Sequence, residues 1–139
     1  MILADSGFWI ALANRRDRHH ESARNALEQW SSEGFVSTWP VLSEVTHILM
    51  ARIGVHQAVA FVESVAHGAC AIPEPPVDAL LRAHVLMSRY RDLPMDLADA
   101  SLVMLAEDLG EGRILSTDQR DVGGHRWKNK RPFRNLLIC

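Results

Sequence analysis

Residues 1–13 read MILADSGFWIALA, and the pattern in this stretch decides the fold class. It begins with a short apolar run that ends at Asp5, which is typical of a buried strand with an acid at its C-terminal end. The residues that follow indicate a helix, for which we expect Ser6 to be the N-cap and Ala13 the last residue. The stretch therefore predicts a strand, an acid and a helix in immediate succession.

The alternation of apolar runs and helical segments continues along the chain. We expect helices over residues 20–30, 39–53, 55–67, 77–91 and 96–109. We expect further strands at residues 35–37, 69–72 and 113–116, and an edge strand at 136–138. Strands that alternate with helices, without hairpin signals, predict an α/β fold in which a parallel sheet carries helices on both faces.

Length and composition fit one globular domain that spans residues 1–139. Hydrophobic residues make up 47% of the chain and charged residues 23%, which is ordinary for a folded domain with one core. No apolar run approaches the roughly 18 residues of a membrane span. The N-terminus lacks the basic region of a signal peptide, so we expect a cytoplasmic protein. Cys70 and Cys139 lack metal-ligand spacing, and we expect a buried residue and a terminal thiol.

Acidic residues stand at positions where ligands commonly bind. Asp5 and Asp118 lie at the C-terminal ends of predicted strands, the edge at which open parallel sheets bind ligands. Glu44 lies about one turn into its helix, beside residues that should face the core, where an unpaired carboxylate is costly. Asp96 and Asp99 project from one side of a first helical turn. Capping is the favoured role for Asp96, whereas Asp99 in company with the other acids favours metal binding.

Carboxylates that converge on one site repel each other, which raises their pKa values and destabilises the fold. A hard divalent cation between them removes this cost. Magnesium prefers oxygen ligands, keeps several waters and usually takes only one or two carboxylates directly. Such an ion lowers the pKa of a bound water and neutralises charge on a phosphate. The acids alone therefore predict a divalent-metal site that needs no serine, cysteine or histidine nucleophile.

Four segments together resemble the PIN domain family, and in particular the VapC-type toxins of bacterial toxin–antitoxin pairs. These segments are MILADSGFWIAL, WPVLSEVTHIL, MDLADASLVMLAEDLG and RILSTDQRDV. They occur in the family's order and at similar spacing through most of the chain. The resemblance implies a PIN-like three-layer sandwich that depends on Mg²⁺, with Mn²⁺ as a substitute. It also implies endonucleolytic cleavage of RNA, a homodimer and neutralisation by a cognate antitoxin.

By position, the family's four catalytic acids correspond to Asp5, Glu44, Asp99 and Asp118. The resemblance implies that Asp5 and Asp99 ligate the metal directly, while Glu44 and Asp118 hold its waters or a second ion. The implied reaction is attack of a metal-activated water on an RNA phosphodiester. Asp96 is a frequent extra acid in the family, and its role stays open.

Three further positions follow from the same resemblance. We expect Ser6 and Thr117 to orient carboxylates or water. Val122 departs from the family, because many relatives carry an aromatic residue there. We expect this departure to change packing without loss of activity.

The segment after Asp118 is locally basic, although the net charge of the chain is -2. RNA bound at the acids needs phosphate contacts, which arginine and lysine supply. We therefore expect Arg120, Arg126 and Lys128 to contact phosphates, whereas the ordinary role of such a charge run is a solvated face.

Two other classes of protein fit part of the pattern. A receiver domain also carries acids at strand ends, but it needs a lysine on a late strand, and the only lysines, Lys128 and Lys130, lie in the polar tail. A non-catalytic PIN-like module would use the acids only to bind a cation or a basic partner protein. A nuclease assay with and without magnesium separates these alternatives.

Overall fold

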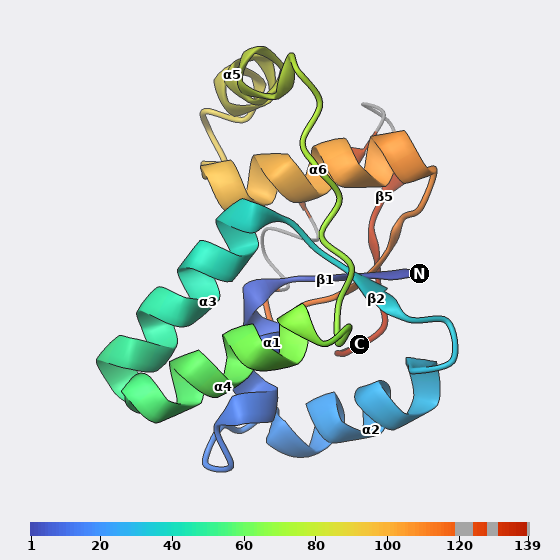
Figure 1. The fold of residues 1–139 in the computed structure, drawn as a ribbon. Helices are drawn as coiled ribbons and strands as arrows, with labels where there is room; N and C mark the ends of the chain where they lie inside the picture. Colours follow the sequence, from blue (N-terminus) through green and yellow to red (C-terminus); the bar gives the residue numbers. More distant parts are fainter. Residues whose placement is uncertain (119–123, 128–130, 139) are drawn as a thin grey trace.

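The computed structural model describes residues 1–118, 124–127 and 131–138 of the chain. Its main sheet consists of β1 (Ile2–Ala4), β2 (Phe35–Val36), β3 (Arg113–Leu115) and β6 (Arg134–Asn135), all parallel, in the order β2-β1-β3-β6. Leu3 pairs with both Val36 and Ile114, so β1 lies inside the sheet between two neighbours. The parallel α/β arrangement expected from the sequence is confirmed (Figure 1).

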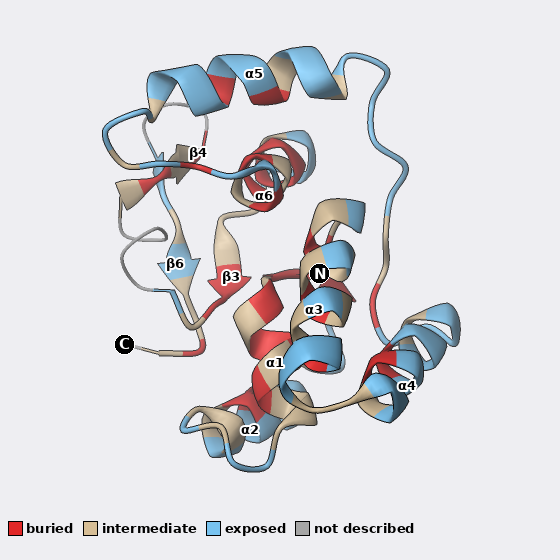
Figure 2. Ribbon diagram, turned by 90° about the vertical axis from the view of Figure 1, so that its left-hand side faces the viewer, coloured by how far each residue is buried: buried red, intermediate tan, exposed pale blue. Residues whose placement is uncertain are grey.

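Helices cover both faces of this sheet. They are α1 (Ser6–Ala13), α2 (His20–Trp30), α3 (Trp39–Arg52), α4 (Val55–Ala66), α5 (Ala79–Arg89) and α6 (Leu97–Leu109). In Figure 1, α6 lies on one side of the sheet with α5 outside it, and α1 to α4 lie on the other side. Figure 2 shows that α6 is largely buried, whereas α5 exposes its outer surface. The three-layer sandwich is therefore observed, with α5 as an additional outer helix.

The core is built from the strands and from one stripe of each helix that covers them. On α3 the side chains of Val41, Val45 and Leu49 are fully buried, at the four-residue spacing of a single helical face. On β1 all three residues are buried, as expected for a strand covered on both faces. This packing fixes the carboxyl ends of β1 and β3 between α1, α3 and α6.

Two expected strands are wrong in detail. Residues 69–72 form only an isolated parallel bridge between Val36 and Ala71. Pro73 follows at once, and because proline has no N–H to donate, the ladder cannot continue there. The last strand of the sheet is β6 rather than residues 136–138, because Arg134 and Asn135 pair with Arg113 and Ile114.

A short antiparallel hairpin was not expected from the sequence. It consists of β4 (Arg126–Trp127) and β5 (Arg131–Pro132). The indole of Trp127 is buried and lies so close to Gly112 that a β-carbon there would approach the ring to 2.5 Å. The Trp127 indole therefore packs the hairpin against the start of β3. None of the helices in the described ranges is long and apolar enough to cross a bilayer.

Candidate active site at the carboxyl edge of the sheet

Asp5 leaves β1 at the carboxyl edge of the sheet and begins α1. Its carboxylate Oδ1 accepts a hydrogen bond from the backbone N–H of Ser6 at 2.7 Å, so Asp5 is the N-cap of α1. The prediction that Ser6 caps this helix is therefore wrong. Asp5 has an extended backbone (φ -85°, ψ 168°) and Ser6 is already helical, which leaves the Ser6 hydroxyl free for another partner.

That partner is Glu44, on α3. The Ser6 hydroxyl donates a hydrogen bond to the Glu44 carboxylate, and both side chains are at least partly buried. This contact joins α1 to α3 across a sequence separation of 38 residues. The contact orients the Glu44 carboxylate towards the side of α3 that faces Asp5.

Ser116 connects the ends of β1 and β3. Its hydroxyl donates to Asp5 Oδ2 at 3.0 Å and accepts the backbone N–H of Asp118 at 3.0 Å. Ser116 is fully buried, whereas Asp118 is exposed. Sequence reasoning named Thr117 but missed Ser116. The signal for it was its position at the end of the predicted strand 113–116, two residues before an acid.

Asp96 and Asp99 form a reciprocal capping box at the start of α6. Asp96 Oδ1 accepts the backbone N–H of Asp99 at 2.8 Å, and Asp99 Oδ2 accepts that of Asp96 at 3.1 Å. The capping role expected for Asp96 is confirmed. The hydroxyls of Thr38 and Ser101 lie 2.6 Å apart, which ties this first turn to the start of α3. The position of Asp99 is thus fixed from two sides.

The carboxylates destabilise one another. Burial raises the pKa of Asp5 to about 6, hydrogen bonds from Ser6 and Ser116 oppose this rise, and the charges of Glu44 and Asp118 add to it. Burial likewise raises the pKa of Asp99 well above its usual range, and the charges of Asp96 and Asp5 contribute. The electrostatic coupling links all five acids that the sequence predicted for the site.

Asp5 and Asp99 line one small cavity of about 20 Å³, together with His125 and Phe133. This space is large enough for about one water molecule. Within the described ranges, no three acidic, histidine or cysteine side chains form a complete coordination group. Magnesium requires no such group, because it usually takes one or two carboxylates and keeps waters for the rest. The two repelling carboxylates therefore match the one or two carboxylates that magnesium takes directly.

The expected phosphate contacts are only partly visible. Arg120 and Lys128 lie outside the described residues, as does Val122. Arg126 begins β4, and its backbone N–H donates to the Tyr90 hydroxyl at 3.0 Å. The preceding residue, His125, borders the cavity of Asp5 and Asp99, so this part of the basic segment runs beside the acids.

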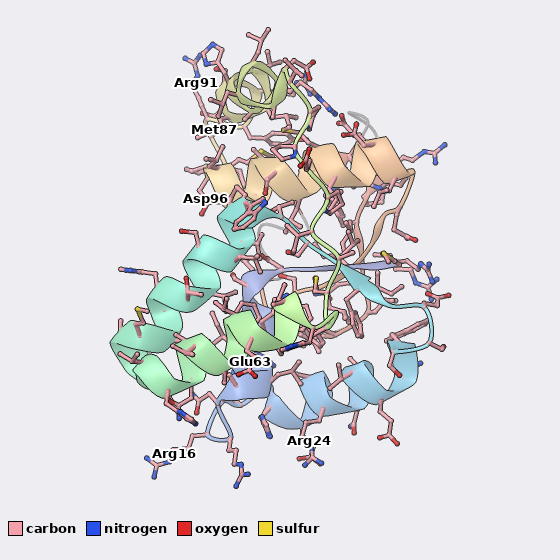
Figure 3. The ribbon with its side chains drawn as sticks, in the orientation of Figure 1. Arg16, Arg24, Glu63, Met87, Arg91 and Asp96 are labelled. Atoms are coloured by element: carbon pink, nitrogen blue, oxygen red, sulfur yellow. The ribbon has the colours of Figure 1, made fainter. Side chains whose placement is uncertain are left out.

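Arg16, which follows α1, and Arg24, on α2, lie far from Asp96. Figure 3 shows Arg16 and Arg24 at the opposite end of the molecule from Asp96.

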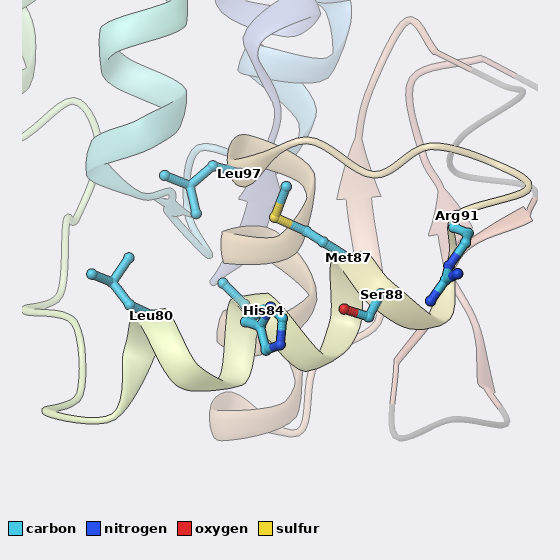
Figure 4. Close-up of a pocket in the computed structure, with 7 residues that line it drawn as sticks. Leu80, His84, Met87, Ser88, Arg91 and Leu97 are labelled. Carbon is cyan, nitrogen blue, oxygen red and sulfur yellow. The ribbon is translucent and has the colours of Figure 1, made fainter.

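Larger apolar hollows lie on the helices, away from Asp5. One of about 490 Å³ runs along α5 and the start of α6, where Leu80, Met87 and Leu97 surround His84 (Figure 4). Another, of about 560 Å³, lies between α3 and α4 and is lined by residues such as Leu42 and Val62. The exposed indole of Trp39 borders this second hollow.

Residues 2–122 match the PIN domain family. Ribonuclease VapC26 of Mycobacterium tuberculosis (strain ATCC 25618 / H37Rv) is 23% identical over 132 residues, which cover 91% of this chain and 97% of that protein.

Two solved structures share the fold. M. tuberculosis VapC20, described as a sarcin–ricin loop cleaving toxin, aligns with a TM-score of 0.80 at 22% identity, over 95% of this chain and 100% of that chain. VapBC2 from Rickettsia felis, bound to a promoter DNA fragment, aligns with a TM-score of 0.63 at 13% identity, over 85% and 89% of the two chains. The family match includes Asp5, Glu44, Asp99 and Asp118. On this match over most of its length, the chain belongs to the PIN domain family.

Proposed function

We propose that this protein is a Mg²⁺-dependent endoribonuclease and the toxin of a type II toxin–antitoxin pair. The observation that carries the proposal is the pair Asp5 and Asp99, two partly buried carboxylates around one small cavity at the carboxyl edge of the sheet. Membership of the PIN domain family and the similarity to ribonuclease VapC26 support RNA as the substrate and the role of a toxin.

In this proposal Asp5 and Asp99 hold the cation, with Mn²⁺ as a substitute for Mg²⁺. A bound divalent cation lowers the pKa of a water molecule and offsets the negative charge of the phosphate. The chain supplies the orientation: Ser6 N–H and Ser116 Oγ fix the two oxygens of Asp5, and the backbone N–H of Asp96 fixes Asp99.

Glu44 and Asp118 complete the proposed site by holding the waters of this ion or a second ion. The Ser6 hydroxyl holds Glu44, and the Ser116 hydroxyl holds the backbone N–H of Asp118. Both carboxylates act as acceptors that orient water beside the phosphodiester. Arg126, with Arg120 and Lys128, contacts RNA phosphates in this proposal, which predicts an affinity that falls steeply with salt.

We further propose a homodimer and a cognate antitoxin as protein partners, and a cytoplasmic location. Two exposed apolar hollows support protein partners, one along α5 and one between α3 and α4. An amphipathic antitoxin segment fits an apolar hollow, and an antitoxin arginine near Asp5 and Asp99 would form charge-assisted hydrogen bonds. The similarity to VapBC2 of R. felis, a toxin–antitoxin complex by its name, points the same way.

Cleavage of purified RNA tests the proposed function. The substrates are total RNA and a sarcin–ricin loop oligonucleotide, the latter because of the name of VapC20. We expect cleavage with Mg²⁺, none with EDTA, and none from Asp5→Asn or Asp99→Asn. Asp78→Asn is the matched control, because Asp78 is exposed and makes no side-chain capping bond. Full activity in EDTA would overturn the mechanism, and Mg²⁺ binding without cleavage of any RNA would leave a non-catalytic module.

A further inference from the structure

The side chain of Asn135 forms hydrogen bonds with both backbone polar groups of Ser116. Its side-chain Oδ1 accepts the N–H of Ser116 at 3.2 Å, and its Nδ2 donates to the carbonyl of Ser116 at 2.9 Å. The same Oδ1 accepts the N–H of Leu137 at 3.0 Å. A single amide side chain thus supplies both the donor and the acceptor that a neighbouring strand would offer.

These hydrogen bonds lie just beyond the point where the parallel ladder between β3 and β6 ends. Asn135 pairs with Ile114 in the register of β3 and β6, and Leu136 N–H still donates to the carbonyl of Ile114 at 2.8 Å. Beyond this bond, the Asn135 side chain rather than the backbone of β6 forms the hydrogen bonds with the backbone of Ser116. The backbone conformation of Ser116 is therefore set by a side chain.

Ser116 in turn forms hydrogen bonds with two of the acids, Asp5 and Asp118. Its hydroxyl donates to Asp5 and accepts the backbone N–H of Asp118, so its direction determines both contacts. The Ser116 side chain is fully buried. Asn135 therefore holds the backbone from which this hydroxyl reaches Asp5 and the Asp118 N–H at the ends of β1 and β3.

Asn135 lies outside the part of the chain that matches the PIN domain family, which ends at residue 122. The cavity of Asp5 and Asp99 is also lined by Phe133, from the same C-terminal segment. Residues beyond the family match thus complete the surroundings of the acids.

We propose that Asn135 is a positioning residue of the metal site, which aligns Asp5 and Asp118 through Ser116. For cleavage this inference rests on the proposed function, but for metal binding it can be tested separately. The simpler role is that Asn135 only anchors the C-terminal segment to the sheet. The two roles predict different Mg²⁺ affinities when the packing of the C-terminal segment is weakened but the Asn135 amide is kept.

The variants are Asn135→Ala, Asn135→Asp and the matched control Leu137→Ala. Leu137 is buried in the same segment, and its truncation weakens packing while the Asn135 side chain and the Leu137 backbone N–H remain. Asn135→Asp keeps the acceptor oxygen but replaces the Nδ2 donor by a second oxygen, which faces the Ser116 carbonyl. Comparison of these variants separates alignment of the acids from anchoring of the segment.

The first measurement is the rise in melting temperature on titration with Mg²⁺ alone, which needs no RNA. We expect the Mg²⁺ concentration needed for a given rise in melting temperature to increase about fivefold or more in both Asn135 variants and to stay unchanged in Leu137→Ala. The second measurement is RNA cleavage. We expect kcat to fall about tenfold in Asn135→Ala while KM stays within about twofold, since alignment rather than RNA binding is lost.

A double-mutant cycle tests whether Asn135 acts through Ser116. If it does, Asn135→Ala costs little further Mg²⁺ affinity or kcat once Ser116→Ala is present. Additive losses would overturn the proposal, as would equal Mg²⁺ responses of Asn135→Ala and Leu137→Ala. A wild-type protein that shows no response to Mg²⁺ would overturn it as well. If the melting temperatures of the wild type and the variants respond to Mg²⁺ as expected but no RNA is cleaved, only the proposed function is refuted.

Discussion

The hydroxyl of Thr117 packs directly against Gly7. A β-carbon added at Gly7 would lie 1.9 Å from Thr117 Oγ1, a distance that no pair of non-bonded atoms tolerates. The first turn of α1 and the turn after β3 therefore approach each other as closely as a glycine permits. Asp5 and Asp118 flank this contact on either side, so the contact holds the two acid-bearing turns together.

Gly7→Ala tests this close approach. In an ordinary helix the change stabilises, by up to about 1 kcal/mol. Here we expect a destabilisation of about 1–3 kcal/mol, because the new methyl group overlaps Thr117. Denaturant unfolding of the protein measures the effect. Addition of Thr117→Ala removes the overlapping oxygen and should restore part of the loss, and a double mutant no more stable than Gly7→Ala would contradict the contact.

Asp99→Asn should stabilise the metal-free protein. The raised pKa of Asp99 reflects burial and the neighbouring charges of Asp96 and Asp5, so its ionised form is a cost to the fold. An asparagine oxygen still accepts the Asp96 N–H, so the cap survives. We expect a melting temperature higher by about 2–4 °C in EDTA at pH 7.5, the shift that corresponds to about 1 kcal/mol.

The same variant should lose its advantage when Mg²⁺ is added, because the wild-type protein alone binds the ion at full strength. Asp78→Asn is the control, and we expect no change from it in either condition. A lower melting temperature of Asp99→Asn in EDTA would show that the charge of Asp99 stabilises the fold instead of destabilising it.

The stability of the metal-free protein should depend on pH through Asp5. Its pKa is about 6 in the folded protein against an ordinary value of 3.8, so between these values the folded state holds a proton that the unfolded state has lost. The free energy of unfolding contributed by Asp5 therefore falls as pH rises from about 4 to about 6, and stays low above that range. Denaturant titrations in EDTA at several pH values measure this slope.

Asp5→Asn removes the titrating group from this comparison. We expect the difference in stability between Asp5→Asn and the wild type to grow in favour of the variant across the same pH range. A difference that is constant with pH would show that Asp5 titrates at its ordinary value in the folded protein.

Ser6→Ala should impair the site through Glu44. The variant leaves a partly buried carboxylate without its hydroxyl donor, which costs about 1–3 kcal/mol. The helix cap is unaffected, because it uses the backbone N–H of Ser6. We expect reduced RNA cleavage at an almost unchanged helix content, measured by circular dichroism. Ser43→Ala, at an exposed position one residue before Glu44, serves as control.

The order of elements and two of the acids were predictable because they follow local patterns. Asp5 and Asp118 each follow a short apolar run, and parallel strands bring such ends to one edge. The capping box of Asp96 and Asp99 was also a local feature, contained in four consecutive residues. Patterns of this kind need no knowledge of which strands are neighbours.

The roles of Ser116 and Asn135 were not predictable for the opposite reason. Ser116 contacts Asp5 because β1 pairs with β3. Asn135 contacts Ser116 because β3 pairs with β6, which contains only two residues in a polar, proline-containing segment. A run so short shows no periodicity from which a strand could be inferred. The hairpin of β4 and β5 was missed for the same reason. Sequence patterns identified the acids, whereas the hydroxyl and amide that orient them depend on tertiary contacts.

The hydrogen bond from Ser116 to Asp5 joins residues 111 positions apart. At translation rates of about 5–20 residues per second, Ser116 is made roughly 6–22 s after Asp5. Until β3 and Ser116 have been made, Asp5 has no partner on β3. The order of the strands therefore delays the assembly of the site that contains Asp5 until β3 and β6 have been made.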